Sequence, residues 1–130
     1  MLKKIYFKEV LMLNLKNKIA IVTGCGSVGN GWGNGRAIAT TLSRQGAKVI
    51  GTDLNINHAN NTKNYIVNEG NFCETFELNM VSESEVDLFF QKVINKYSTI
   101  DILVNNVGRS EPGDPENMTF ETWHEQFNVN

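Results

Sequence analysis

Short runs of apolar residues alternate with longer amphipathic segments along this chain. The short runs are rich in β-branched side chains and have the length of buried strands. The predicted strands cover residues 18–23, 47–52, 72–78 and 100–104. The longer segments space their apolar residues as helices do. The predicted helices cover residues 36–45, 57–69 and 82–97, and a last helix begins near Thr119.

The same spacing predicts which side of each helix is buried. In the first helix that side holds Ala37, Ile38, Thr41 and Leu42. In the second it holds Ala59, Tyr65, Ile66 and Val67. In the third it holds Val86, Phe89, Phe90, Val93 and Ile94. Ser82, followed three positions on by Glu85, matches a capping box that would begin the third helix.

Strands and helices therefore alternate through the whole predicted order. This order implies parallel strands joined by right-handed crossovers, with helices on both faces of the sheet. The strands read as largely continuous apolar runs, and the last is apolar except for Asp101, as expected of a sheet covered on both sides. The predicted fold class is α/β, a doubly wound parallel sheet.

Composition narrows the range of partners. The chain has 130 residues, of which 41% are hydrophobic, and a net charge of −2. Nucleic acids and anionic membranes attract basic surfaces, so neither is expected as a partner. Cys25 and Cys73 are too few for a disulfide framework or a zinc site, and we expect no metal. Residues 1–12 hold no apolar run long enough for a signal peptide or a membrane span, and the expected location is the cytoplasm.

A glycine-rich segment, residues 23–35, joins the first predicted strand to the first helix. Glycine permits a tight turn and lets a pyrophosphate approach the backbone. The helix that we expect to start at Arg36 offers free N–H groups to the phosphates. A flexible surface loop is the alternative, but this position is where nucleotides bind in such sheets. The expected cofactor contacts in this segment are Gly24, Ser27, Gly33, Asn34 and Gly35.

Asp53 follows the second predicted strand, where such folds place an acid that binds the ribose hydroxyls. Its carboxylate would repel the 2′-phosphate of NADP. The residues that follow, 54–56, supply no cation that would attract this phosphate. NAD is therefore the expected cofactor.

With these residues in view, the chain resembles the N-terminal half of the short-chain dehydrogenase/reductase family from about Leu13 to Asn130. The family's Thr-Gly-x-x-x-Gly-x-Gly pattern is matched by Thr23-Gly24 and by Gly33 to Gly35. The spacer between the two parts is longer than in the family and contains Trp32. A second register would use Gly29 and Gly31, which leaves open which N–H groups meet the phosphates.

The resemblance implies further site residues. Asn79 and Met80 end the third strand where the family contacts adenine. Asn105-Asn106-Val107-Gly108 is similar to the family's Asn-Asn-Ala-Gly, which implies cofactor contacts by Asn106 and Gly108. The segment from Trp123 to Asn130 resembles the helix that carries the catalytic Asn, so Asn130 is the implied catalytic residue.

The family's catalytic Ser and its Tyr-x-x-x-Lys have no counterpart in these residues. None of Tyr6, Tyr65 and Tyr97 has a Lys four residues on, so we expect no catalysis by the chain alone. The predicted organisation is an N-terminal extension, residues 1–12, and a truncated Rossmann-like half-domain, residues 13–130.

The resemblance also implies function. The full-length protein would be an NAD-dependent oxidoreductase of alcohols or ketones, and a homo-oligomer. A non-catalytic nucleotide-binding module remains an alternative. An S-adenosylmethionine-dependent methyltransferase is a second one, which the Asn-Asn-x-Gly segment disfavours.

The resemblance implies a seven-stranded sheet, of which this chain holds four strands. We expect the strand at residues 100–104 to be an apolar edge protected by Asp101 alone. The last helix, with Phe120, Trp123 and Phe127, would lose the surface on which it packs. The isolated chain is therefore expected to be poorly soluble or partly unfolded.

Four further side chains receive a structural interpretation from the sequence. His58 and His124 are expected to be solvated on polar helix faces. Trp32 is expected to anchor its loop and Trp123 to pack on a helix face.

Overall fold

The computed structural model describes residues 13–29 and 31–130, and strand alternates with helix throughout this part of the chain. The elements are β1 (Ile19–Thr23), α1 (Asn34–Arg44), β2 (Lys48–Asp53), α2 (Ile56–Asn68), β3 (Cys73–Glu77), α3 (Glu83–Tyr97), β4 (Ile102–Val104) and α4 (Phe120–Val129). The strands pair in parallel in the order β3-β2-β1-β4, which confirms the predicted α/β fold class. The predicted extension at residues 1–12 lies outside the described residues.

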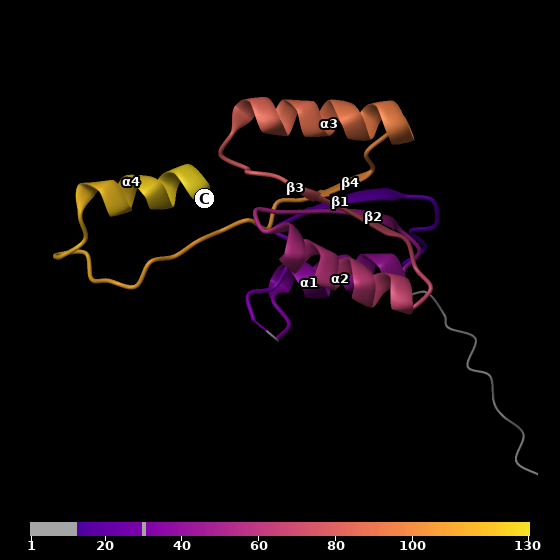
Figure 1. Ribbon diagram of the computed structural model, residues 1–130, viewed down its shortest axis with the longest axis horizontal. Coiled ribbons are helices and arrows are strands. Elements are labelled where there is room, and N and C mark those ends of the chain that lie inside the picture. Colours follow the sequence, from indigo (N-terminus) through magenta and orange to yellow (C-terminus); the bar gives the residue numbers. More distant parts are fainter. Residues whose placement is uncertain (1–12, 30) are drawn as a thin grey trace, which may run out of the picture.

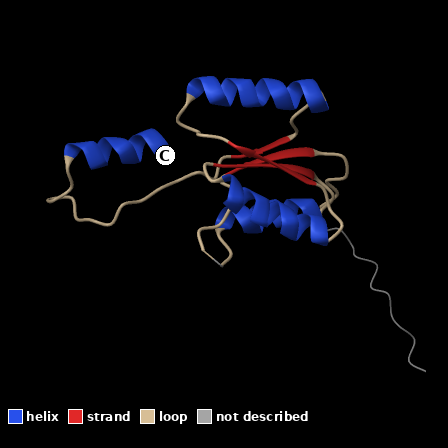
Figure 2. Ribbon diagram, viewed as in Figure 1, coloured by secondary structure: helices blue, strands red, loops and turns tan. Residues whose placement is uncertain are grey.

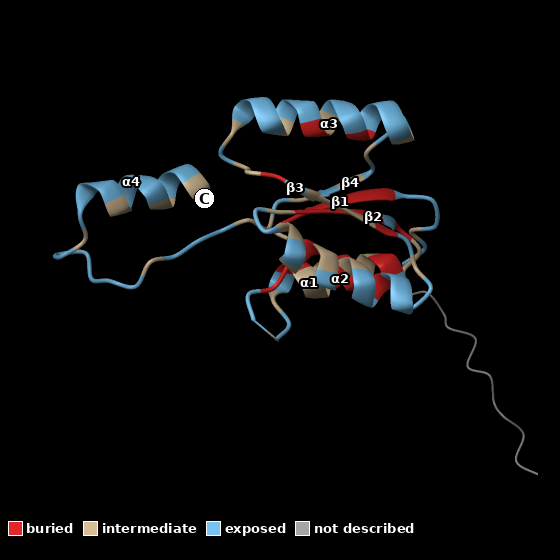
Figure 3. Ribbon diagram, viewed as in Figure 1, coloured by how far each residue is buried: buried red, intermediate tan, exposed pale blue. Residues whose placement is uncertain are grey.

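The sheet is the middle layer of the fold. Helices α1 and α2 cover one face and α3 covers the other, while α4 stands apart from all three (Figures 1 and 2). All five residues of β1 are buried, because this strand lies inside the sheet and under helices on both sides (Figure 3). The carboxyl ends of the strands lie at one edge of this layer, where the functional loops begin.

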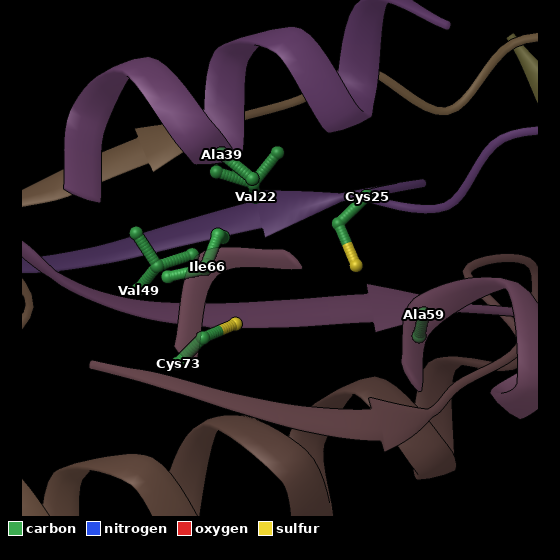
Figure 4. Packing of buried hydrophobic residues seen from close by; sticks show 7 residues of the cluster. All are labelled: Val22, Cys25, Ala39, Val49, Ala59, Ile66 and Cys73. Carbon is green, nitrogen blue, oxygen red and sulfur yellow. The ribbon is translucent and has the colours of Figure 1, made fainter. Parts of the chain in front are cut away.

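The core consists of one apolar cluster on each face of the sheet. Val22 and Val49 point toward α1 and α2, where they pack with Ile66 (Figure 4). Their neighbours Ile21 and Ile50 are paired in the strand register and pack toward α3. Side chains alternate between the faces of a strand, so β1 and β2 supply both clusters.

The buried side of α1 differs from the prediction. The helix begins at Asn34, two residues earlier than expected, and it buries Gly35, Ala39, Thr40 and Ser43. Thr41, which the apolar spacing placed on the inner side, is exposed. Ile38 and Leu42 do pack against the core, as predicted, although they are only partly buried. The fully buried positions hold small residues because the start of α1 lies close to the end of β1, and apolar spacing does not reveal this.

In α2 the prediction is partly wrong as well. Ala59 and Ile66 are buried as expected, and Thr62 is also fully buried. Tyr65 and Val67 are exposed, 41% and 48% respectively. Thr62 is tolerated inside because its hydroxyl group is hydrogen-bonded, as described below.

The start of α3 is not the predicted capping box. The helix does begin at Glu83, but the Ser82 side chain makes no capping hydrogen bond. The Glu85 carboxylate instead accepts a hydrogen bond of 3.2 Å from the N–H of Asn79. Glu85 thus binds the loop before the helix and is not available to the Ser82 backbone. On the inner side, Phe89 and Val93 are buried as predicted, whereas Ile94 is 44% exposed.

β4 forms one edge of the described sheet, as predicted. It pairs with β1, and Leu103 is 47% exposed. Asp101 precedes this strand and accepts hydrogen bonds from Lys18 Nζ (2.8 Å) and from the N–H of Ile19 (2.9 Å). Asp101 therefore joins the start of β4 to the start of β1.

The apolar side of α4 is open. Three large side chains on this helix have much of their surface in solvent. They are Phe120 (71%), Trp123 (51%) and Phe127 (68%). Trp123 packs against Phe127 of the same helix, with ring centroids 5.2 Å apart. His124 is exposed, as predicted, and lies against Phe120.

Candidate nucleotide-binding site

The turn between β1 and α1 is built by an unusually close approach of two glycines. Gly24 has φ of +61°, a conformation that favours glycine. A Cβ at Gly35 would lie 1.8 Å from the Gly24 carbonyl oxygen. Only a residue without a side chain fits there, and the first turn of α1 is thereby held directly over the end of β1.

This approach leaves the start of α1 open to a ligand. Gly33 is the N-cap residue, and no side chain caps the helix. The first N–H groups of a helix have no partner within it, and they carry a partial positive charge. The first hydrogen bond within α1 runs from the N–H of Ala37 to the carbonyl oxygen of Gly33. The amides of Asn34 to Arg36 are therefore suited to bind an anion such as a pyrophosphate.

Two adjoining cavities lie along this turn. One, of about 410 Å³, follows the glycine segment, and the other, of about 570 Å³, extends from Asp53 to Gly108. All ten residues predicted to bind the cofactor line one or both cavities. They are Gly24, Ser27, Gly33, Asn34, Gly35, Asp53, Asn79, Met80, Asn106 and Gly108.

Asp53 is the last residue of β2 and is oriented by the backbone around it. Its Oδ2 accepts a hydrogen bond from the N–H of Gly26 and its Oδ1 accepts one from the N–H of Asn55, both of 3.0 Å. A Cβ at Gly26 would lie 2.6 Å from Asp53 Oδ2. Gly26 was not among the predicted contacts, although it belongs to the glycine segment, and it is required here because the carboxylate occupies the space of a side chain.

His58 departs from the prediction. It is half-buried and lines the larger cavity, close to Gly26 and Asp53. The sequence predicted a solvated residue on a polar helix face, but α2 begins so near the end of β2 that its first turn borders the cavity. Its position five residues after Asp53 is the one signal that could have indicated this.

Asn106 joins the end of β4 to the turn after β1. Its side-chain Nδ2 donates to the carbonyl oxygens of Thr23 and Gly24, at 3.1 and 3.0 Å. Its backbone N–H donates to Thr23 Oγ1 at 3.0 Å. Asn106 thus borders both cavities and also fixes the shape of the glycine turn.

Asn79 and Met80 form part of the wall of the larger cavity. The Asn79 Oδ1 accepts a hydrogen bond of 3.2 Å from the N–H of Val81, which orients the side chain within its own loop. Met80 also packs against the apolar cluster below α3.

Asn130 is placed differently from the predicted cofactor residues. Its Nδ2 donates to the Arg109 carbonyl oxygen at 2.9 Å, and its Oδ1 accepts from the Arg109 N–H at 3.2 Å. It is not among the described residues that line the two cavities, whereas its neighbour Val129 is. The Asn130 amide therefore connects the end of α4 to the segment after Gly108.

This geometry agrees with comparisons to known proteins. The sequence model of the short chain dehydrogenase family matches residues 18–130. The chain belongs to this family. A curated relative, the 3-oxoacyl-(acyl-carrier-protein) reductase FabG of Escherichia coli, is 34% identical over 118 residues, which are 91% of this chain and 45% of that protein.

Solved structures of short-chain dehydrogenases have the same fold. A putative short-chain dehydrogenase/reductase from Burkholderia xenovorans superposes with a TM-score of 0.86 at 33% identity, over 89% of this chain and 46% of that one. A metagenomic short-chain oxidoreductase in complex with NADP superposes with a TM-score of 0.81 at 27% identity, over 89% and 51% of the two chains. The chain thus spans about half the length of the short-chain dehydrogenases that it matches.

Both cysteines of this short-chain dehydrogenase chain are free and buried. Burial raises the pKa of the Cys25 thiol far above its ordinary value, and it raises the pKa of the Cys73 thiol to about 12. Both therefore remain neutral thiols at physiological pH. Within residues 13–29 and 31–130, no group of three or more His, Cys, Asp or Glu side chains could hold a metal ion. No helix in that part of the chain has the length and apolar character needed to cross a membrane.

Proposed function

We propose that this chain is the NAD(H)-binding half of an oxidoreductase that transfers hydride between the nicotinamide and an alcohol or ketone. The cofactor, when bound, supplies the hydride. The start of α1 would bind the pyrophosphate, and Asp53 would accept hydrogen bonds from the adenosine ribose. Asn130 would contribute to the catalytic site through its contact with Arg109. The 130 residues alone are expected to bind cofactor without turnover.

The observation that carries the choice of NAD over NADP is the fixed carboxylate of Asp53. Both of its oxygen atoms accept backbone hydrogen bonds and the group borders the larger cavity. A 2′-phosphate beside it would meet a negative charge at close range. The residues that follow, Leu54 and Asn55, offer no compensating cation. A relative solved with NADP shows that the other cofactor also occurs in this family, so a direct comparison is needed.

The test is a titration of the chain with NADH and with NADPH at the same ionic strength. Trp32 lines the smaller cavity, so its fluorescence reports binding. Hydrogen bonds to a charged group contribute about 1.5–3 kcal/mol, which corresponds to roughly 10- to 100-fold in affinity. We expect NADH to bind at least about tenfold more tightly than NADPH, and Asp53→Asn to remove most of this preference.

Asp87→Asn is the matched control, because Asp87 is exposed on α3 and lies outside both cavities. It removes the same charge from the chain and should leave the preference unchanged. If wild type and Asp53→Asn prefer NADH over NADPH by the same factor, Asp53 does not determine the cofactor preference. A thermal shift with S-adenosylmethionine and none with NADH would favour a methyltransferase instead.

We also propose that the full-length protein is a cytoplasmic homo-oligomer. The exposed apolar side chains of α4 support an interface on this helix, since so large an open apolar surface is typical of a binding face. Light scattering of the full-length protein would determine the oligomeric state. A monomer at all accessible concentrations would contradict this part of the proposal.

A further inference from the structure

The glycine segment of this chain is longer than the family pattern, and a small set of hydrogen bonds holds its added part. Ser27 Oγ donates to the Gly31 carbonyl oxygen at 2.7 Å and accepts from the N–H of Gly33 at 3.0 Å. Ser27 therefore draws the two sides of the loop together next to the start of α1. The residues after it, Val28 and Gly29, are exposed.

Arg36 provides a second tie to the same loop. Its Nη1 donates to the Gly31 carbonyl oxygen at 3.0 Å, and its Nε donates to Thr62 Oγ1 at 3.2 Å. Arg36 is half-buried, and the hydrogen bonds of its guanidinium go to two neutral oxygen atoms. Among the described residues no carboxylate forms a salt bridge with it.

Thr62 is fully buried and extends the connection into α2. Its hydroxyl accepts from Arg36 and donates to the Cys25 carbonyl oxygen at 2.9 Å. Cys25 follows Gly24 in the turn after β1. One hydroxyl group thus links α2 both to the beginning of the glycine segment and, through Arg36, to its end.

An aromatic contact supports the same arrangement. Trp32 lies edge-on against Tyr65 of α2, with ring centroids 4.9 Å apart. This agrees with the prediction that Trp32 anchors its loop. Side chains on α1 and α2 therefore hold the loop at Gly31 and at Trp32, next to the first N–H groups of α1.

From these contacts we infer that Arg36 is a positioning residue for the phosphate site. Together with Thr62 it holds the extended loop so that the first amides of α1 face the pyrophosphate of the cofactor. The inference rests on the proposed binding of a nicotinamide dinucleotide. Arg36 acts through the two hydrogen bonds of its planar fork, an arrangement that a lysine ammonium cannot reproduce.

The experiment compares Arg36→Met, Arg36→Lys and Thr62→Val with wild type, using NADH directly and ADP or adenosine as competitors. Losing the hydrogen bonds of one charged donor should weaken NADH and ADP binding about tenfold, or about 1.4 kcal/mol. Adenosine lacks phosphates, so its affinity should change less than about twofold. Arg36→Lys should lose nearly as much affinity as Arg36→Met.

Arg44→Met is the matched control. Arg44 lies on the same helix and forms a salt bridge with Glu69, just past the end of α2, away from the loop. This variant removes a similar cation and a similar tie between α1 and the α2 segment, but it should leave ADP affinity unchanged. In a Trp123→Phe background, acrylamide should quench Trp32 more strongly in Arg36→Met than in wild type.

The outcomes separate this inference from the proposed function. If the wild-type chain binds neither NADH nor ADP, both are wrong. If it binds NADH but Arg36→Met binds ADP as tightly, Arg36 has no positioning role. Wild-type affinity in Arg36→Lys would show that charge alone matters and would also overturn the inference.

The losses of ADP affinity caused by Arg36→Met and Thr62→Val should be non-additive in the double variant, because each substitution breaks the same connection. Purely additive losses would contradict it.

Discussion

The close approach of Gly35 to Gly24 makes a sharp test of the site geometry. An alanine Cβ at position 35 would lie 1.8 Å from the Gly24 carbonyl oxygen and 2.8 Å from Asn106 Nδ2. The first distance is roughly half of the 3.4 Å at which ordinary contact begins. The neighbour is backbone, which cannot swing aside, so Gly35→Ala requires the first turn of α1 to move away from β1.

The expected loss of stability follows from two opposing terms. Overpacking costs about 1–3 kcal/mol, and a rigid neighbour places this case at the upper end. Replacing glycine by alanine within a helix returns about 1 kcal/mol. The net destabilisation is about 2 kcal/mol, which for a domain of this size lowers Tm by roughly 6–8 °C.

The effect on binding should be of similar size. The free N–H groups of α1 would move with the helix, and charges at a helix N-terminus contribute up to about 2 kcal/mol. We therefore expect NADH to bind roughly 10- to 30-fold more weakly. Thermal unfolding followed by circular dichroism and NADH titration at low micromolar chain concentration measure the two quantities.

Gly31→Ala is the control for Gly35→Ala. Apart from its neighbours in the chain, no described residue has an atom within 4 Å of a Cβ at Gly31, so stability should change by less than about 0.5 kcal/mol. If Gly35→Ala has the Tm and the NADH affinity of wild type, the close packing of α1 on the Gly24 turn is refuted.

Three further predictions concern stability, reactivity and association. Lys18 and a backbone N–H hold the pKa of Asp101 below its usual 3.8, so its contribution to stability is present at neutral pH and is lost as the pH falls through that lowered pKa. Asp101→Asn should therefore lower Tm at pH 7, with a difference that shrinks toward pH 3; a constant difference would show that the charge is irrelevant. Burial raises the thiol pKa of Cys25 and Cys73, so both should react with a thiol reagent only after unfolding, and rapid labelling of the folded chain would contradict this. Phe127 is 68% exposed on α4, so Phe127→Glu should reduce association or precipitation of the isolated chain, as measured by light scattering. A wild-type chain that is already a soluble monomer would contradict this prediction.

Several details of the site depend on contacts that no local pattern contains. Asn106 hydrogen-bonds to Thr23, which lies 83 positions earlier in the chain, and Arg36 reaches Thr62, which lies 26 positions later. The burial of Thr62 was not predicted, because a threonine in a polar segment resembles any solvent-facing residue until its partners are known. The placement of His58 beside the cavity has the same origin.

Local patterns also proved insufficient where two local arrangements compete. Ser82 and Glu85 have the spacing of a capping box, yet Glu85 binds the backbone of Asn79 instead. Apolar spacing placed Thr41 on the inner side of α1, whereas close packing at Gly35 turns a face of small residues toward the sheet. In the first case another local contact outweighs the predicted one, and in the second the packing of α1 on the turn after β1 does.

The sequence by itself determined the order of strands and helices, the parallel sheet, the glycine segment after the first strand and the acid after the second. These features follow from periodicity and from the conformations that glycine allows, which are properties of neighbouring residues. The tertiary structure alone decided that α1 begins at Asn34, that Gly26 must leave room for Asp53, and that Arg36 holds the extended loop. These depend on how closely separate elements pack, because a distance between two helices or between a helix and a strand is set by all the side chains between them.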